Sequence, residues 1–280
     1  MKKLLSLIAA LALCHSAQAW DGALHTAVAS VAHDNLTDVA RTELAKALGG
    51  YSIIYDAQWL DDVAKGKEYA HVRNYHNVPL TAKGKIIAAK KAAKSQVEAI
   101  ASAKAFDALC KAVTALESRE KLSAKEVADN IRYIVYIVGD LHCASHYVFE
   151  DRIEHRSYKY YYNKEKKPRN YMKYWESEAI TSTFTWKSNE FVHQLSRLSA
   201  DEKARVTAGS LTKWVESNAA LYRPMYDLMY NEHRFGKDEY RLWHNNIYPL
   251  ATDHIGVAGY RLAALLNGLF DASQPKVKIK

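Results

Sequence analysis

Histidine and carboxylate side chains recur in this sequence in four short groups with the residue types that bind metal ions. Imidazole nitrogens and carboxylate oxygens are ligands that zinc prefers in proteins. In chain order the groups are Trp20 with His25, Asp61 with His76, Tyr136 with Asp140 and His146, and Met172 with Glu176. A lone histidine is more often an ordinary core or surface residue, so the hypothesis of a metal centre depends on all four groups together.

The first residues are typical of an export signal with a processing site. Lys2 and Lys3 precede an apolar run, and Ala17-Gln18-Ala19 is the small-x-small pattern that signal peptidase cuts. Removal of residues 1–19 would create a new amino terminus at Trp20. Because a free α-amine titrates at about pH 8, its neutral form can bind a metal ion together with its own carbonyl oxygen. We therefore expect a secreted or periplasmic protein with a terminal metal ligand.

Composition and charge are those of a soluble globular protein with a basic surface. Apolar residues make up 49% of the 280 and charged residues 25%, which excludes a disordered chain. The formal net charge of +8 favours polyanions or anionic membrane surfaces as partners. No second long apolar run follows the leader, so we predict no transmembrane segment, and we predict no protein partner. Without a linker or repeat, residues 20–280 are expected to form one domain. Cys110 and Cys143 could pair in an exported compartment, which the sequence leaves open.

One predicted helix presents two members of the metal-binding groups. Ser123 and Glu126 form a capping box at its start, and apolar residues recur at helical spacing from there to residue 140. Tyr136 and Asp140 are four residues apart, so they share one face of this helix. Gly139, beside Asp140, leaves room for close approach of backbone or metal.

Further elements are predicted by equally local signals. Helices are expected from Thr37, as the cap, to Leu48 before Gly49-Gly50, from Lys83 to Lys111, around Trp214–Tyr226 and around Tyr260–Asn267. The tyrosine-rich run Tyr158–Tyr162 is the only β-like segment and predicts a small hairpin. The expected fold class is therefore mainly α, a single multi-helix domain with a small β-hairpin.

With these residues, the sequence resembles the zinc-dependent single-strand-specific nucleases of fungi and plants, which have bacterial relatives and are related to the zinc phospholipases C. The matching residues are Trp20 with His25, Trp59-Leu60-Asp61, Tyr75-His76, Gly139-Asp140 with His142 and His146, and Asn170-Tyr171-Met172 with Trp175-Glu176. The resemblance extends to Arg261–Asn267, so it covers nearly all of residues 20–280. The fold that it implies is the multi-helix domain of these enzymes.

The resemblance implies up to three zinc ions. It places the first on the amine and carbonyl of Trp20, His25 and Asp140, the second on Asp61, His76 and the bridging Asp140, and the third on His146 and Glu176. Tyr136 and Met172 stand where the family has histidine. A metal can lower the pKa of a phenol, so Tyr136 could still offer an oxygen. Met172 is a poor substitute, because a thioether suits Cu(I) better than zinc. His142 or His155 could complete the third site instead.

The implied activity is that of a zinc-dependent endonuclease, which hydrolyses single-stranded DNA or RNA to 5′-phosphorylated products and so serves nucleic-acid breakdown. Asp61 would orient or deprotonate the attacking water. Ala64 stands where many members have a phosphate-contacting arginine, which Lys65 or Lys67 could replace.

Unpaired bases bind proteins by stacking on aromatic rings. The candidates for such stacking are Tyr75, Tyr147, Tyr160 and Tyr171. Core packing is the commoner role for any single tyrosine. Two alternative functions stay open. Glu176 in place of aspartate favours a zinc phospholipase C-like esterase. The departures at Ala64, Tyr136 and Met172 favour a metal-poor relative that binds nucleic acid and catalyses little.

Overall fold

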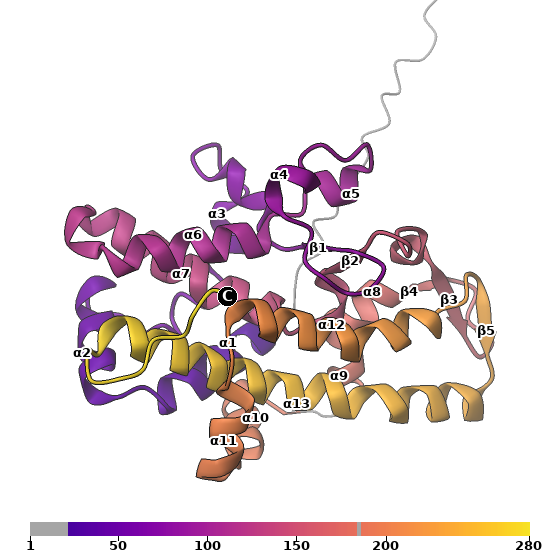
Figure 1. The fold of residues 1–280 in the computed structure, drawn as a ribbon. Helices are drawn as coiled ribbons and strands as arrows, with labels where there is room; N and C mark the ends of the chain where they lie inside the picture. The colour runs from indigo at the N-terminus through magenta and orange to yellow at the C-terminus, as the bar shows by residue number, and fades with distance from the viewer. Residues whose placement is uncertain (1–21, 184–185) are drawn as a thin grey trace, which may run out of the picture.

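The computed structural model describes residues 22–183 and 186–280, so the expected leader and Trp20 lie outside the described residues. Helices dominate this part of the chain, with a few short strands (Figure 1). The prediction of a mainly α fold is confirmed. No helix of the described residues is long and apolar enough to cross a membrane.

Three helices form the frame on which the remaining elements are placed. They are α1 (Gly22–Asp34), α7 (Ala124–Asp140) and α13 (Lys237–Phe270). Helix α1 packs against α13 and also touches α7. Helix α13 runs along much of the molecule (Figure 1), and the predicted helix around Tyr260–Asn267 is only its last third. One continuous apolar cluster reaches from Leu24 to Phe270 and so joins the two ends of the described chain.

The two helices with local capping signals form as predicted. The hydroxyl of Ser123 accepts a hydrogen bond from the Glu126 N–H, and the Glu126 carboxylate accepts one from the Ser123 N–H. These bonds satisfy two N–H groups at the start of α7 that have no partner within the helix. Thr37 caps α2 (Asp38–Ala47) with one bond, in which its hydroxyl accepts from the Ala40 N–H. The helix ends at Gly49-Gly50, where both glycines have positive φ.

The prediction of one long helix over residues 83–111 is wrong. The segment contains two short helices, α4 (Ala89–Ala92) and α5 (Glu98–Ala101), and only then α6 (Ala105–Glu117), which packs against α7. The hydroxyl of Ser95 accepts from the Val97 N–H in a turn that competes with helix. The N–H groups of residues 104 and 105 bond to the carbonyls of residues 74 and 77. A new helix therefore begins where the chain is tied to the segment around His76.

A two-stranded parallel sheet was not predicted, and it brings two candidate ligands together. Strand β1 (Val78–Leu80) follows η1 (Ala70–Asn74), and strand β2 (Tyr147–Phe149) follows η3 (Ala144–His146). Val78 lies opposite Tyr147 in the register. Because β1 starts two residues after His76 and β2 starts directly after His146, the pairing holds these two histidines beside each other.

The tyrosine-rich segment forms the predicted hairpin. Strand β3 (Lys159–Tyr162) pairs antiparallel with β4 (Arg169–Asn170), and β5 (His233–Phe235), which was not predicted, joins β3 in parallel. The hairpin lies at one end of the molecule (Figure 1). Between β2 and β3 the chain forms a 3₁₀ turn, η4 (Glu154–Ser157).

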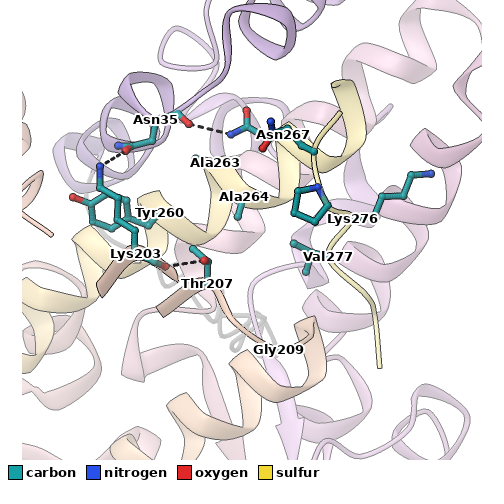
Figure 2. A pocket seen from close by; sticks show the side chains of 12 residues that line it. Asn35, Lys203, Thr207, Gly209, Tyr260, Ala263, Ala264, Asn267, Lys276 and Val277 are labelled. Atoms are coloured by element: carbon teal, nitrogen blue, oxygen red, sulfur yellow. Dashed lines mark hydrogen bonds between the residues drawn. The ribbon is translucent and has the colours of Figure 1, made fainter. Parts of the chain in front are cut away.

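Helix α12 (Leu211–Asp227) runs beside α13 and is fixed at its start by the end of the described chain. It follows α10 (Ser188–Leu195) and α11 (Ala200–Thr207). The N–H groups of Leu211 and Thr212 donate to the carbonyls of Lys278 and Ile279, at 2.9 and 3.0 Å. The same terminal segment borders a cavity of about 390 Å³ between α11 and α13 (Figure 2). None of the predicted site residues lines this cavity.

Both cysteines of the described residues are free thiols. Cys143 is buried and Cys110 is half-buried. Burial raises the pKa of the Cys110 thiol to about 12, which disfavours the reactive thiolate.

Candidate functional site

Asp140, the last residue of α7, is the centre around which three histidines gather. Its side chain is fully buried. Nε2 of His25, from α1, lies 3.2 Å from Oδ1 of Asp140, and Nε2 of His146 lies 3.8 Å from the same oxygen. Nδ1 of His76 lies 3.1 Å from Oδ2. Three imidazoles from different elements therefore lie within 3.8 Å of one carboxylate.

Electrostatics keep Asp140 and His146 in the protonation states that metal ligands need, whereas they favour the protonated form of His76. Burial alone would raise the pKa of Asp140, but the three imidazoles hold it at about 2, so the carboxylate is ionised near neutral pH. Burial lowers the pKa of His146 to about 4, so its imidazole is neutral. Burial would lower the pKa of His76 too, but its hydrogen bond to Asp140 wins and raises the pKa.

Gly139 is required for His25 to approach Asp140. A Cβ atom on Gly139 would lie 2.8 Å from Nδ1 of His25, closer than real Cβ contacts allow. The ring of His25 also stacks on Tyr136, with centroids 4.2 Å apart. The room expected beside Asp140 is thus filled by an imidazole.

Tyr136 and Asp61 form a pair at the edge of the centre. The Tyr136 hydroxyl, from α7, donates to Oδ1 of Asp61, from α3 (Trp59–Val63), at 2.7 Å. Burial raises the pKa of Tyr136 well above its ordinary value, so the phenol stays protonated. Burial also raises the pKa of Asp61, although the Tyr136 hydrogen bond opposes this. The pair presents one carboxylate oxygen in a fixed position.

Glu176 reaches the centre from a π-helical turn. The chain runs from α8 (Tyr171–Lys173) through the π turn η5 (Tyr174–Glu178) into α9 (Ala179–Thr181), and such turns are frequent at functional sites. Burial raises the pKa of Glu176 to about 7, and the nearby charge of Arg156 opposes this effect. Met172 is buried one turn earlier, with its sulfur 3.8 Å from the hydroxyl of Tyr226.

The unpaired polar atoms of the centre suit a metal ion. Among the described residues, buried atoms without a hydrogen-bond partner include Nε2 of His25, Oδ1 of Asp140, both ring nitrogens of His146 and Oε1 of Glu176. A buried polar atom without a partner is costly, and these are the donor types of zinc sites. Within residues 22–183 and 186–280, no group of three or more His, Cys, Asp or Glu side chains is arranged to hold a metal ion. The residue types are those of a zinc site, but the side chains contact one another, with His25 and His76 at 3.2 and 3.1 Å from Asp140.

Helix α12 holds the loop that carries His146. Asn218, Tyr222 and Tyr226 are spaced by four residues, so they share one buried face of the helix. They donate to the carbonyls of residues 141, 142, 144 and 147, at 2.6 to 2.9 Å. The loop between Asp140 and β2 is therefore bonded to α12 along its length. Sequence reasoning predicted this helix and missed its role, although the spacing of the polar residues was a usable signal.

Several other predicted residues lie outside the centre. Both ring nitrogens of His142 are engaged, with the Val138 carbonyl and with Arg261. His155 stacks on Tyr158 with centroids 4.5 Å apart. Neither histidine completes the third site in this structure.

The candidate stacking residues differ in exposure. Tyr147, Tyr160 and Tyr171 are fully buried, so no base can reach their rings. The Tyr147 hydroxyl donates to the Leu141 carbonyl, which is a structural role. Only Tyr75 remains a candidate; it is half-buried, and its ring meets Tyr133 edge-on at 5.6 Å.

A basic residue near Ala64 was expected to replace the phosphate-contacting arginine of the family. Lys65 is exposed, in the turn after α3, and is paired with Asp62 at 3.1 Å. Nε of Arg73 donates to the Ala64 carbonyl at 2.7 Å, so an arginine lies beside the position where the sequence has none. Sequence reasoning missed Arg73, because the contact depends on how η1 folds back on α3.

Comparison with known proteins gives a family match over nearly the whole chain. A family model described as S1/P1 Nuclease matches residues 20–271, which include all four groups of predicted ligands. A comparison with curated protein sequences finds no significant match.

Proposed function

Because the chain belongs to the S1/P1 nuclease family, we propose that it is a secreted, zinc-dependent endonuclease that hydrolyses single-stranded DNA or RNA to 5′-phosphorylated products. The observation that supports this most strongly is the group of buried imidazoles that gather around the carboxylate of Asp140. A nuclease of this family acts on phosphodiester bonds, and this group has the ligands for the metal ions that such hydrolysis uses.

The ligands that we propose come from seven residues spread along the chain. They are the amino terminus of Trp20, His25 of α1, Asp61 of α3, His76 after η1, Asp140 of α7, and His146 with Glu176. Zinc would supply Lewis acidity, which lowers the pKa of water and offsets negative charge on a phosphoryl group.

Asp61 is the residue best placed to handle the proton of the attacking water. One of its oxygens accepts from Tyr136, and this bond fixes the direction of the other. The raised pKa of Asp61 makes it a stronger base than an exposed aspartate. Asp140 stays ionised and offsets positive charge in the centre, and neutral His146 keeps a lone pair available.

An aromatic group beside the centre supports a single-stranded substrate. A small buried cluster contains Leu60, Val72 and Tyr136. Packed against it are the partly buried aromatic residues Trp59, Tyr69, Tyr75 and Tyr133. Unpaired bases bind proteins by stacking on such rings, whereas paired bases in a duplex are covered by their neighbours. The net charge of +8 favours a polyanion as well.

The test compares substrates on purified, zinc-loaded protein. We expect cleavage of single-stranded oligonucleotides, with 5′-phosphate ends found by mass spectrometry, and far slower cleavage of duplexes. Hydrolysis of a phosphatidylcholine analogue alone would favour the phospholipase C alternative. Asp61→Asn should lower kcat at least about 100-fold. Its matched control is Asp62→Asn, since Asp62 is exposed and paired with Lys65.

A second candidate, a metal-poor protein that binds nucleic acid, is favoured by the surroundings of Met172. The residue is buried, and its sulfur lies 3.8 Å from the Tyr226 hydroxyl where a third imidazole would be needed. Metal analysis with amino-terminal sequencing of the same sample separates the candidates. Two or more zinc ions per chain starting at Trp20 support the nuclease, and fewer than two support the binding protein.

A further inference from the structure

Arg156 connects the two chain segments that carry His76 and His146. It lies in η4, and one terminal nitrogen of its guanidinium donates to the carbonyl of Ser145, the residue before His146. The other terminal nitrogen lies 3.3 Å from Oδ1 of Asn77, the residue after His76. The two imidazole rings have centroids 6.3 Å apart. The guanidinium therefore borders the candidate metal centre.

The charge of Arg156 is held by neutral acceptors. Within residues 22–183 and 186–280, no carboxylate oxygen lies within 4.0 Å of a guanidinium nitrogen of Arg156. Arg152, one turn earlier, is by contrast paired with Asp151 and Asp227, at 3.0 and 2.9 Å. A half-buried cation without a counter-ion is costly, because its lost hydration is not replaced by an opposite charge. A bound anion would supply such a charge.

The guanidinium of Arg156 lies beside the centre, because it bonds to the neighbours of His146 and His76 along the chain. A guanidinium has five N–H donors in one plane, and two N–H···O contacts leave others for an additional acceptor.

We propose that Arg156 binds a non-bridging oxygen of the phosphate group on which the enzyme acts. This inference rests on the proposed function for the identity of the ester, and on the geometry above for the phosphate itself. A planar guanidinium suits phosphate because two parallel N–H groups can meet two oxygens. Lys65 is paired with Asp62, and Arg73 is exposed, where solvent screens its charge. Arg156 is the phosphate-binding residue.

The test uses ligands that differ in one charge. Thymidine dinucleosides joined by a phosphorothioate or by a methylphosphonate have the same bases, but only the phosphorothioate linkage is charged. Inorganic phosphate is the third probe. Binding to zinc-loaded protein, freed of excess zinc, is measured by calorimetry for the wild type, Arg156→Gln, Arg156→Lys, Arg73→Gln and the matched control Arg152→Gln.

We expect Arg156→Gln to weaken the binding of the phosphorothioate at least about tenfold, as loss of a charge-assisted hydrogen bond predicts. Binding of the methylphosphonate should change less than about twofold, because that linkage has no charge to lose. Arg156→Lys should keep the preference for the charged analogue at reduced affinity, and it covers the case that Arg156→Gln does not fold. Arg152→Gln should bind both analogues as the wild type does.

Three results would overturn the assignment. Equal weakening of both analogues in Arg156→Gln means that the residue only supports the fold. If Arg156→Gln still binds the phosphorothioate more tightly than the methylphosphonate, and Arg73→Gln does not, the phosphate is bound by Arg73 and not by Arg156. Equal binding of inorganic phosphate by wild type and Arg156→Gln, or none by the wild type, means that the arginine does not recognise phosphate.

Failure of the proposed function would give a different pattern. The wild type would then bind neither dinucleoside analogue, yet bind inorganic phosphate, and Arg156→Gln would lose that binding. The substrate would be another phosphate ester, and the assignment of Arg156 would stand.

Discussion

The hydroxyl of Tyr136 donates a hydrogen bond of 2.7 Å to the carboxylate of Asp61, and it connects α7 to α3 at the edge of the metal centre. This bond lowers the pKa of Asp61 against the opposing effect of burial. Tyr136→Phe removes only the hydroxyl, so the pKa of Asp61 should rise. We expect the acidic limb of the pH–kcat profile to move up by about one unit, measured with a single-stranded oligonucleotide.

Tyr133→Phe is the control for this substitution. Tyr133 lies one turn before Tyr136, and its hydroxyl is 3.5 Å from His71 at the surface. Its removal should leave the profile unchanged. An unshifted acidic limb in Tyr136→Phe would show that Asp61 does not determine it.

Gly139→Ala should displace the ring of His25, because the new methyl group would lie 2.8 Å from Nδ1. We expect weaker zinc binding by at least about tenfold, as for other losses of ligand position, measured by competition with a chelator. Gly236→Ala is the control, since a Cβ there meets no atom within 4 Å. Wild-type zinc affinity in Gly139→Ala would mean that His25 is not a ligand.

Glu176→Gln should stabilise the metal-free protein at high pH and not at low pH. The folded-state pKa of about 7 lies above the ordinary value of 4.5, so the folded state binds the proton more tightly than the unfolded state. The wild type therefore loses stability as pH rises from about 4.5 to 7, by about 3 kcal/mol. Glutamine is neutral at every pH in this range, so the variant does not lose this stability as the pH rises.

The measurement is the melting temperature of protein treated with chelator, at pH 4.5 and pH 8. The gain from Glu176→Gln should appear only at pH 8. Glu165→Gln is the control with the opposite sign, because the hydrogen bond from Arg169 lowers the pKa of Glu165. An equal gain at both pH values would show that packing and not ionisation is responsible.

Met172→His should increase the zinc bound per chain by one ion. The thioether is a poor zinc ligand, and an imidazole there would join His146 and Glu176. Elemental analysis after removal of excess zinc gives the count. Met225→His, on α12, controls for adventitious binding to an added histidine. An unchanged count in Met172→His would mean that the position does not face a third ion.

The sequence predicted the parts of this centre that depend on neighbours along the chain. The capping box and apolar spacing of α7 are local, so they indicated that Tyr136 and Asp140 share a face. The pairing of β1 with β2 joins segments far apart in the sequence, and no residue pattern near His76 or His146 predicted it. The break in the lysine-rich segment also depends on distant carbonyls, which accept from residues 104 and 105.

The sequence also could not predict which aromatic rings are buried. Tyr75, Tyr147 and Tyr171 are alike in type and in spacing from the predicted ligands, yet only Tyr75 keeps an exposed part. Arg156 lies in a segment without a recognisable motif. That its charge has no carboxylate partner follows only from the structure, where its acceptors are a carbonyl and an amide oxygen.

The terminal segment that bonds to the start of α12 has a consequence for proteolysis. Clipping the chain before Lys278 would leave the N–H groups of Leu211 and Thr212 without their partners and let the first turn of α12 fray. That helix bonds to the backbone around His146. A nick in the terminal segment should thus loosen the loop that carries His146 from a distance, without removing a single candidate ligand.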